Sequence, residues 1–338
     1  MGAYVLRRLL VTALTVVTVS FAAFVGFGLS FDPSYPLAVG AQHARAHAFV
    51  QAYYHLNDPI LSRYWRWATG IVHHGFGRAV SIDVEGTVPP RFRSLGTPIG
   101  PQLWRGSAIT AQLVGAALVL VVLGSAVVGT VSAQRRRFRL DVSTRFLAYL
   151  AAAVPTFLIG DLMRRAIVPH ETFALVNGTF SASGGGWWFL IGRPTGGFVD
   201  WFRHMTLPAV ALAIGLIGLY SRYVRSSMLV ELGQPYVSVA RAKGLPERRV
   251  VVRHALRNSL IPFTSLVSLE VGGVIGASLA ADAVFNTGGL ASTFLSSLSQ
   301  GDPFQLTALF VVAAGVVCIF TFLGDALVGV LDPRTRVG

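Results

Sequence analysis

The sequence predicts an all-α, polytopic membrane protein with six transmembrane helices, and three features of the chain support this prediction. Hydrophobic residues make up 53% of the 338 residues and charged residues only 13%, with a mean hydropathy of +0.60. Soluble domains carry about a quarter charged residues, so the composition disfavours a soluble enzyme, a disordered protein or a nucleic-acid binder. Six apolar runs approach or exceed the roughly 20 residues that a helix needs to cross a bilayer. The positive charge, finally, is concentrated between alternate runs.

The apolar runs define the expected helices in chain order. The first run is longer than the apolar core of a cleaved signal peptide, which usually has about 7–15 residues, so we interpret it as an uncleaved anchor. The second is the most uniformly apolar, and the fourth is the shortest, with Arg222 near its inner end. The expected helices cover residues 9–30, 108–131, 146–168, 206–224, 258–281 and 303–329.

The distribution of arginine predicts the orientation. If the N-terminus is cytoplasmic and the helices alternate, the inner segments are 1–8, 132–145, 225–257 and 330–338. Together with Arg222 they contain 17 basic and four acidic residues, so they carry the whole net charge of +13. Such an excess of basic residues on the cytoplasmic side is typical of membrane proteins, and it explains the basicity without nucleic acid. We therefore expect both termini in the cytoplasm.

The expected organisation has three parts: an N-terminal transmembrane helix at 1–30, an extracytoplasmic segment at 31–107, and a core domain of five transmembrane helices at 108–338. Aromatic residues alternate with arginine and histidine over 53–70, which indicates a short amphipathic helix at the lipid headgroups. A docking surface for an extracellular partner is the alternative. The second outer segment, 170–205, is expected to be a loop with interfacial Trp187 and Trp188.

Charged residues inside the apolar runs are few. Asp161 precedes Arg164 and Arg165 by three and four residues, the spacing of helical ion pairs. Glu270 and Asp325 lie deeper, and we favour structural pairing over substrate contact for both. The single cysteine, Cys318, excludes a disulfide framework or a cysteine-rich metal site. The histidines form no metal or nucleophile constellation, so the sequence predicts no catalytic, cofactor or metal-binding residues.

The inner segment 225–258 is the most informative part of the chain. Gly233 and Pro235 should end the preceding helix, and residues 236–245 predict a short amphipathic helix. Gly244, followed by Pro246, is suited to a left-handed C-terminal stop. A second helix should start near Glu247 and run into the fifth apolar run. A short helix held between two spans can act as a lever, because pushing it moves both attached helices.

Several motifs of this segment resemble a known family. ARAKGL (240–245) followed by RRVVVRHALRNSLIP (248–262) is similar to the permease loop of binding-protein-dependent ABC importers of the dipeptide/oligopeptide/nickel class, and most closely to their B-type subunit. Ala240 and Gly244 match the general form of that loop, whereas Ser238 and Val239 replace its Glu and first Ala. Similar segments include SRYVRSSML (221–229), DAVFNTGGL (282–290) and the closing LDPRTRVG (331–338).

The resemblance implies a type I ABC-importer permease fold and a coupling site for an ATPase subunit. Ala240 would face a groove of that subunit with little room to spare. The residues that the resemblance assigns to coupling are Tyr236, Val237, Ala240, Arg241, Ala242, Lys243, Gly244, Leu245 and Pro262.

The chain lacks the Gly-Lys-Ser/Thr of a phosphate-binding loop, since its only lysine, Lys243, is followed by Gly244. ATP and Mg²⁺ are therefore expected on partner subunits. The resemblance implies two cytoplasmic ATPase subunits, a homologous second permease and an extracytoplasmic substrate-binding protein, in a bacterial cell membrane. The expected cargo is a short peptide; a nickel complex, haem or another small solute remains an alternative, as does an ATP-independent secondary transporter, although we find no inverted repeat.

Overall fold

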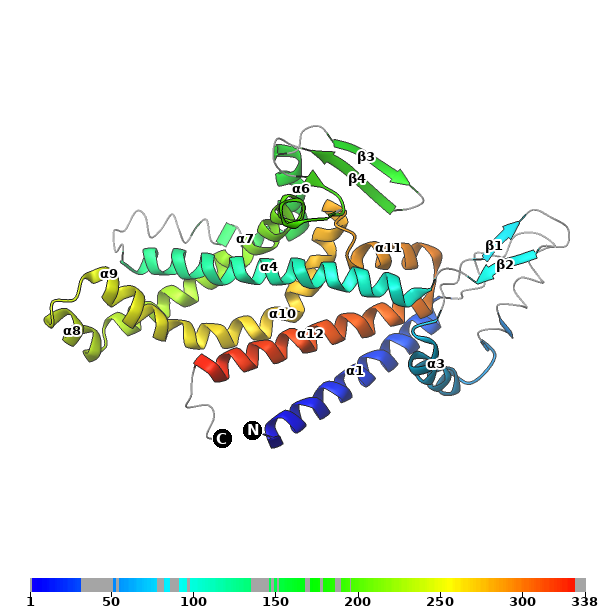
Figure 1. The fold of residues 1–338 in the computed structure, drawn as a ribbon, viewed down its shortest axis with the longest axis horizontal. Coiled ribbons are helices and arrows are strands. Elements are labelled where there is room, and N and C mark those ends of the chain that lie inside the picture. The colour runs from blue at the N-terminus through cyan, green and yellow to red at the C-terminus, as the bar shows by residue number, and fades with distance from the viewer. Residues whose placement is uncertain are drawn as a thin grey trace. The chain divides into compact units, whose positions relative to one another are not determined.

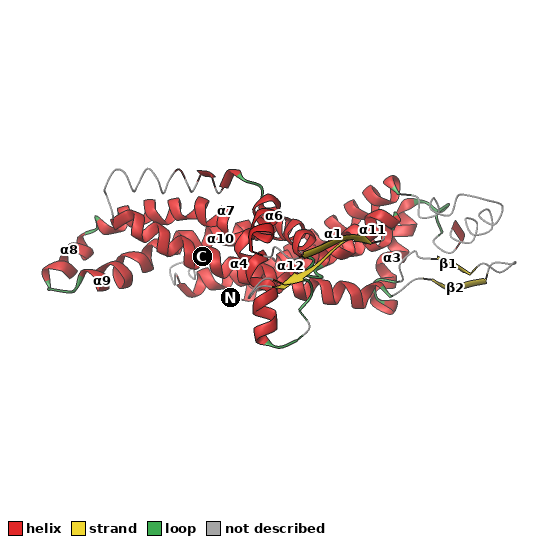
Figure 2. Ribbon diagram, turned by 90° about the horizontal axis from the view of Figure 1, so that it is seen from above, coloured by secondary structure: helices red, strands yellow, loops and turns green. Residues whose placement is uncertain are grey.

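The computed structural model describes residues 2–31, 51–52, 55–77, 82–85, 91–95, 98–134, 146, 149–150, 152–167, 171–176, 179–185, 190–194 and 196–331. The fold is helical, as predicted, and strands are confined to short segments (Figure 2). The chain forms two compact units, one comprising Met1–Ile109, Leu175–Phe180 and Gly288–Cys318 and the other the remainder. The expected division into an N-terminal helix (1–30), an extracytoplasmic segment (31–107) and a core domain (108–338) stays a prediction.

The first unit contains two complete helices near the N-terminus, α1 (Gly2–Ser30) and α3 (Ile60–His74), followed by the start of α4 (Ile99–Gln134). It also contains α11 (Leu290–Gln300) and the first part of α12 (Pro303–Leu331). The ring of Phe24 on α1 lies 5.6 Å from the rings of Tyr64 and Trp67 on α3 and 6.1 Å from that of Phe304 on α12. Aromatic pairs at such distances stabilise a packed core beyond the area they bury.

The second unit is built on α7 (Phe198–Leu232) and α10 (Arg257–Phe285), with the rest of α4 packed beside α7 (Figure 1). A Cβ added at Gly129 of α4 would lie 2.7 Å from Cβ of Val224 and 2.8 Å from the carbonyl oxygen of Ser221. Only glycine allows this close approach, which is typical of helix pairs in membranes. Val121, Ala213, Tyr220 and Phe263 belong to the buried core between these helices.

Four helices of the described residues are long and apolar enough to cross a membrane: Leu10–Ser30, Ile99–Gln134, Phe198–Leu232 and Pro303–Gly324. A fifth is added if Glu270–Phe285 and Leu290–Ser299 are counted as one broken span. The expected helix at 146–168 is described as α6 (Thr156–Ile167), of 12 residues, which follows a break at Val154 and Pro155. Proline lacks an N–H and restricts the preceding residue, so a helix begins there more readily than it continues. The count of six spans stays a prediction.

Short strands occupy two segments that the sequence did not predict as sheet. β1 (Ile82–Glu85) pairs antiparallel with β2 (Arg91–Leu95). β3 (Glu171–Val176), β4 (Thr179–Gly185) and β5 (Leu190–Ile191) form a second sheet in that order, so the expectation of a plain loop over 170–205 is wrong. Runs of a few β-branched and aromatic residues are too short to separate strand from loop by pattern. Trp187 and Trp188 lie outside the described residues.

Candidate functional site

The segment between α7 and α10 folds as a helical hairpin within the second unit. Helix α7 ends at Leu232, and α8 (Pro235–Ala242) starts with a proline, whose fixed φ and missing N–H suit the first helical position. Helix α9 (Glu247–Arg249) follows Pro246 and continues through a π-helical stretch, η2 (Val250–Leu256), into α10. The predicted order of helix, glycine stop and second helix is confirmed.

Helix α8 ends in a Schellman motif centred on Gly244. Gly244 has a φ of +74°, and its N–H donates to the carbonyl of Arg241 at 2.9 Å. The next N–H, of Leu245, donates back to the carbonyl of Ala240 at 3.3 Å. These two hydrogen bonds, together with the apolar packing of Leu245 against the cluster that includes Ala240, define the motif. Since a Cβ at Gly244 would meet no atom within 4 Å, the requirement for glycine comes from the backbone conformation alone.

The inner face of α8 packs against its own chain. Val237 is fully buried, Ala240 is 6% exposed, and both form a cluster with buried Val250 of η2, against which Leu245 packs. The structure thus corrects the expectation that Ala240 faces a partner's groove, because that side chain is already covered by η2. The hydrophobic pattern of an eight-residue helix specifies an apolar face but not which surface will cover it.

The outer face of α8 is exposed at its centre. Val239 is 53% exposed and lies beside exposed Ser238 and Ala242. Arg241 and Lys243 are also exposed, so this face combines an apolar centre with a basic edge. Of the nine residues predicted for coupling, the structure brings eight into this hairpin. Pro262 lies apart, inside α10.

An ion pair joins α8 to α9. The guanidinium of Arg241 donates to both carboxylate oxygens of Glu247, with Nη2–Oε1 at 2.7 Å and Nε–Oε2 at 3.1 Å. The hydrogen bonds from Arg241 hold the pKa of Glu247 below its usual value, and the same bonds raise the pKa of Arg241. The sequence did not predict this pair, because six residues with an intervening turn do not match helical spacing.

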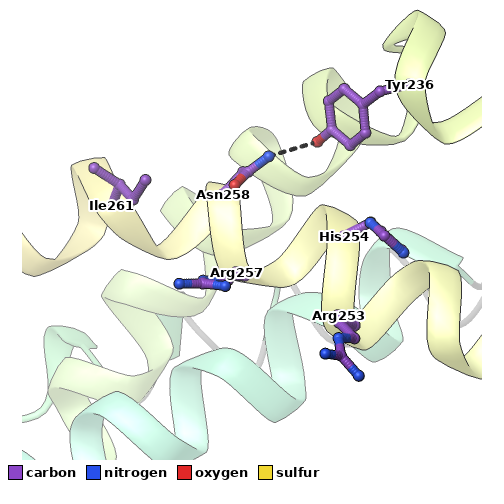
Figure 3. Close-up of a pocket in the computed structure, with 6 residues that line it drawn as sticks. All are labelled: Tyr236, Arg253, His254, Arg257, Asn258 and Ile261. Carbon is purple, nitrogen blue, oxygen red and sulfur yellow. Dashed lines mark hydrogen bonds between the residues drawn. The ribbon is translucent and has the colours of Figure 1, made fainter. Parts of the chain in front are cut away.

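Tyr236 connects α8 to both long helices. Its hydroxyl donates to Oε2 of Glu231 at the end of α7 and accepts from Nδ2 of Asn258 on α10 at 3.0 Å (Figure 3). Burial, and then the bond to the Glu231 carboxylate, raise the pKa of the Tyr236 phenol. The hydroxyl of Ser227 on α7 also donates to the carbonyl of Ser259 on α10, at 3.2 Å. Tyr236 was predicted as a site residue, but Glu231 and Asn258 were not, since no local pattern joins them.

The helix that receives the loop has two consecutive departures from α-helical hydrogen bonding. The first is η2, whose Val251 and Ala255 pack into the core beside Val224 and Met228 of α7. The second is Pro262, which has no N–H to offer the carbonyl of Asn258 one turn earlier. Adjacent residues of η2 thus belong to two separate clusters, Val250 to the one under α8 and Val251 to the α7–α10 core.

Two of the charged residues expected to have structural partners, Asp161 and Glu270, have them. Asp161 accepts from Arg164 and Arg165 of α6, each at 2.8 Å. The hydroxyl of Tyr220 donates to Glu270 at 3.1 Å. The side chain of Asp325 lies outside the described residues. In the part of the chain that the structure describes, no group of three His, Cys, Asp or Glu residues could hold a metal ion.

Comparison with known proteins relates the chain to a family of transport proteins. Residues 125–337 match the family described as binding-protein-dependent transport system inner membrane component. The chain is 28% identical over its whole length to the dipeptide transport system permease protein DppB of Bacillus subtilis, covering 99% of that protein. It is 29% identical over the full length of both chains to the oligopeptide transport system permease protein OppB of Mycobacterium bovis. A putative peptide permease protein of Brucella suis is 32% identical over 83% of this chain and 82% of its own length.

Proposed function

Because this chain belongs to the family of binding-protein-dependent transport system inner membrane components, we propose that it is a permease subunit of an ATP-driven importer of short peptides. With a second, homologous permease it forms the path across a bacterial cell membrane, and both of its termini are cytoplasmic. It is a transport subunit rather than an enzyme, like the relatives to which it is similar. The peptide cargo rests on the names of those relatives.

The observation that carries the proposal is the hairpin of α8 and η2. Helix α8 is bound through Tyr236 to both α7 and α10, and through Val237 and Ala240 to η2. A force on its exposed face is therefore transmitted to two membrane helices at once. Such a rigid short helix with an exposed apolar centre suits the docking of a moving cytoplasmic subunit.

That subunit must supply the energy, because this chain has no phosphate-binding loop. We assign ATP and Mg²⁺ to two separate ATPase subunits, which contact residues 236–245 of the hairpin. An extracytoplasmic binding protein delivers the peptide on the other side. A nickel complex, haem or another small solute is the alternative cargo, since one fold serves different ligands.

Reconstitution tests this function. The chain, its second permease, two ATPase subunits and the binding protein would be placed in liposomes with labelled dipeptides, longer peptides or a nickel complex outside. We expect peptide accumulation that requires ATP and every subunit, whereas this chain alone neither binds nor hydrolyses ATP. Accumulation by this chain without ATP would contradict the proposal. Uptake of the nickel complex but not of peptides would show that the cargo is a nickel complex rather than a peptide.

A further inference from the structure

An open cavity of about 310 Å³ lies beside α8, where η2 passes into α10. Figure 3 shows its lining, which comes from the first turn of α8 and from both sides of the junction between η2 and α10. The lining residues are Tyr236, Arg253, His254, Arg257, Asn258 and Ile261. Exposed Val239 is not among them, so the cavity and the outer face of α8 are separate surfaces.

The cavity is positively charged. Arg253 and Arg257 are exposed and stand four residues apart, about one turn of the helix that carries them. Among the residues that the structure describes, no carboxylate forms an ion pair with either arginine. Glu231 accepts a hydrogen bond from the Tyr236 hydroxyl but does not line the cavity. Both arginines line one open cavity and have no acidic partner among the described residues, which favours an anion with several oxygens, such as a phosphate.

The cavity also changes from polar to apolar in the direction of the membrane. Arg253 and Arg257 immediately precede the apolar run 258–281, whereas Ile261 lies in its first turn. If that run crosses the bilayer, the arginines lie at the level of the inner-leaflet phosphates and Ile261 at the level of the first acyl carbons. Basic pockets of this kind on the cytoplasmic side of membrane helices bind anionic headgroups.

We propose that this cavity binds the phosphate headgroup of an anionic phospholipid of the inner leaflet. Arg253 and Arg257 pair with the phosphate oxygens, and Ile261 contacts the start of the acyl chains. Because Tyr236 and Asn258, which form the hydrogen bond between α8 and α10, line the same cavity, a bound lipid fills the space beside that bond. The lipid thus supports the position of the coupling hairpin.

The test uses the full chain in nanodiscs of phosphatidylcholine containing a minor fraction of phosphatidylglycerol. Retained lipid is counted by native mass spectrometry for the wild type and for Arg253→Gln/Arg257→Gln. The matched control is Arg248→Gln/Arg249→Gln, which removes the same charge from exposed residues of α9 that do not line the cavity. Direct charge-assisted hydrogen bonds to a phosphate are stronger than general attraction to the surface, so the first variant should retain phosphatidylglycerol at least about tenfold more weakly than the control.

Three further results decide between explanations. We expect the control to retain phosphatidylglycerol as the wild type does, and equal loss in both variants would overturn a defined site in favour of general charge attraction. Arg253→Lys/Arg257→Lys, which keeps the charge, should restore most of the retention. Lost retention in this variant at an unchanged helix content overturns the proposal. Displacement of the lipid by millimolar inorganic phosphate would assign the cavity to a soluble anion instead.

A final arm separates the lipid from a protein partner. In detergent without anionic lipid, Arg253→Gln/Arg257→Gln should bind the ATPase subunits as the wild type does. Selective loss of ATPase binding, with unchanged retention of phosphatidylglycerol, would overturn the lipid assignment. Since lipid retention is measured on this chain alone, its outcome is independent of whether the cargo is a peptide.

Discussion

Two short amphipathic helices, α8 and α3, are held in place by different means. Helix α8 has eight residues and is fixed by its backbone stop at Gly244, by two buried side chains and by a tyrosine bonded on both sides. Helix α3 has 15 residues and contacts α1 mainly through rings, with one hydrogen bond of 2.7 Å between Tyr64 and Ser20. Hydrogen bonds and the backbone stop fix the orientation of α8, whereas contacts between rings leave α3 more freedom to shift along α1. The constraints on α8 fit the proposed transmission of a displacement, and α3 has no comparable fixation among the described contacts.

The largest effect is expected from placing a charge on the buried face of α8. Ala240→Glu puts a carboxylate beside Val237 and Val250, which costs about 3 kcal/mol or more when the charge has no partner. The hairpin should lose its protection from hydrogen exchange even without ATPase subunits. Val239→Glu, on the exposed neighbour, is the control and should leave that protection intact while weakening ATPase binding. Equal protection in both variants would mean that Ala240 faces outward after all.

The next effect tests the backbone stop. Gly244→Val forces a β-branched residue to a φ of +74°, at a cost of about 1–2 kcal/mol, and should disrupt the Schellman motif. The membrane helices remain inserted, but ATP hydrolysis continues without uptake or the ATPase subunits no longer bind. The control is Gly301→Val at the end of α11, where φ is +64°, the backbone is left-handed and an added Cβ would make only an ordinary contact of 3.8 Å with Phe31. If the two variants transport equally well, the hairpin is not a lever.

A smaller effect separates the two tyrosines. Tyr236→Phe removes the hydroxyl that joins Glu231 to Asn258, and Tyr64→Phe removes only the bond to Ser20. One hydrogen bond contributes about 1 kcal/mol, so Tyr236→Phe should lower coupled uptake several-fold. Tyr64→Phe should change uptake little, because the rings of Phe21 and Phe24 still hold α3. A greater loss from Tyr64→Phe would reverse the comparison.

The smallest effect concerns the exposed Arg241–Glu247 pair. Exposed ion pairs contribute about 0–1 kcal/mol, so Glu247→Gln should reduce hydrogen-exchange protection of α8 only slightly at pH 7. Since the folded pKa of Glu247 lies below its ordinary value, the contribution is complete above that ordinary value. It disappears as the pH falls through the lowered pKa, where wild type and variant should converge. A difference that persists below the lowered pKa would show that the carboxylate charge is not its source.

Local signals predicted the elements that glycine and proline define. Gly233, Pro235, Gly244 and Pro246 marked the ends of α7 and α8 because their backbone preferences act over a few residues. Long-range choices escaped prediction: Tyr236 and Asn258 are 22 residues apart, and the cover of Ala240 comes from η2. The break at Pro155 was hidden inside an apolar run that suggested one continuous helix. Composition gives length and polarity, but contacts decide which face is buried.

The π-helical stretch η2 makes the orientation of α8 sensitive to insertions and deletions. A π-helical turn holds more residues than an α-helical one, so each extra residue rotates the adjoining helix by about 100° around the axis. Deleting one residue from Val250–Leu256 would favour an α-helix and turn α8 to a different side of α10. The number of residues in η2 therefore sets the side of α10 on which α8 lies. Substitutions within η2 are less disruptive than a change of its length.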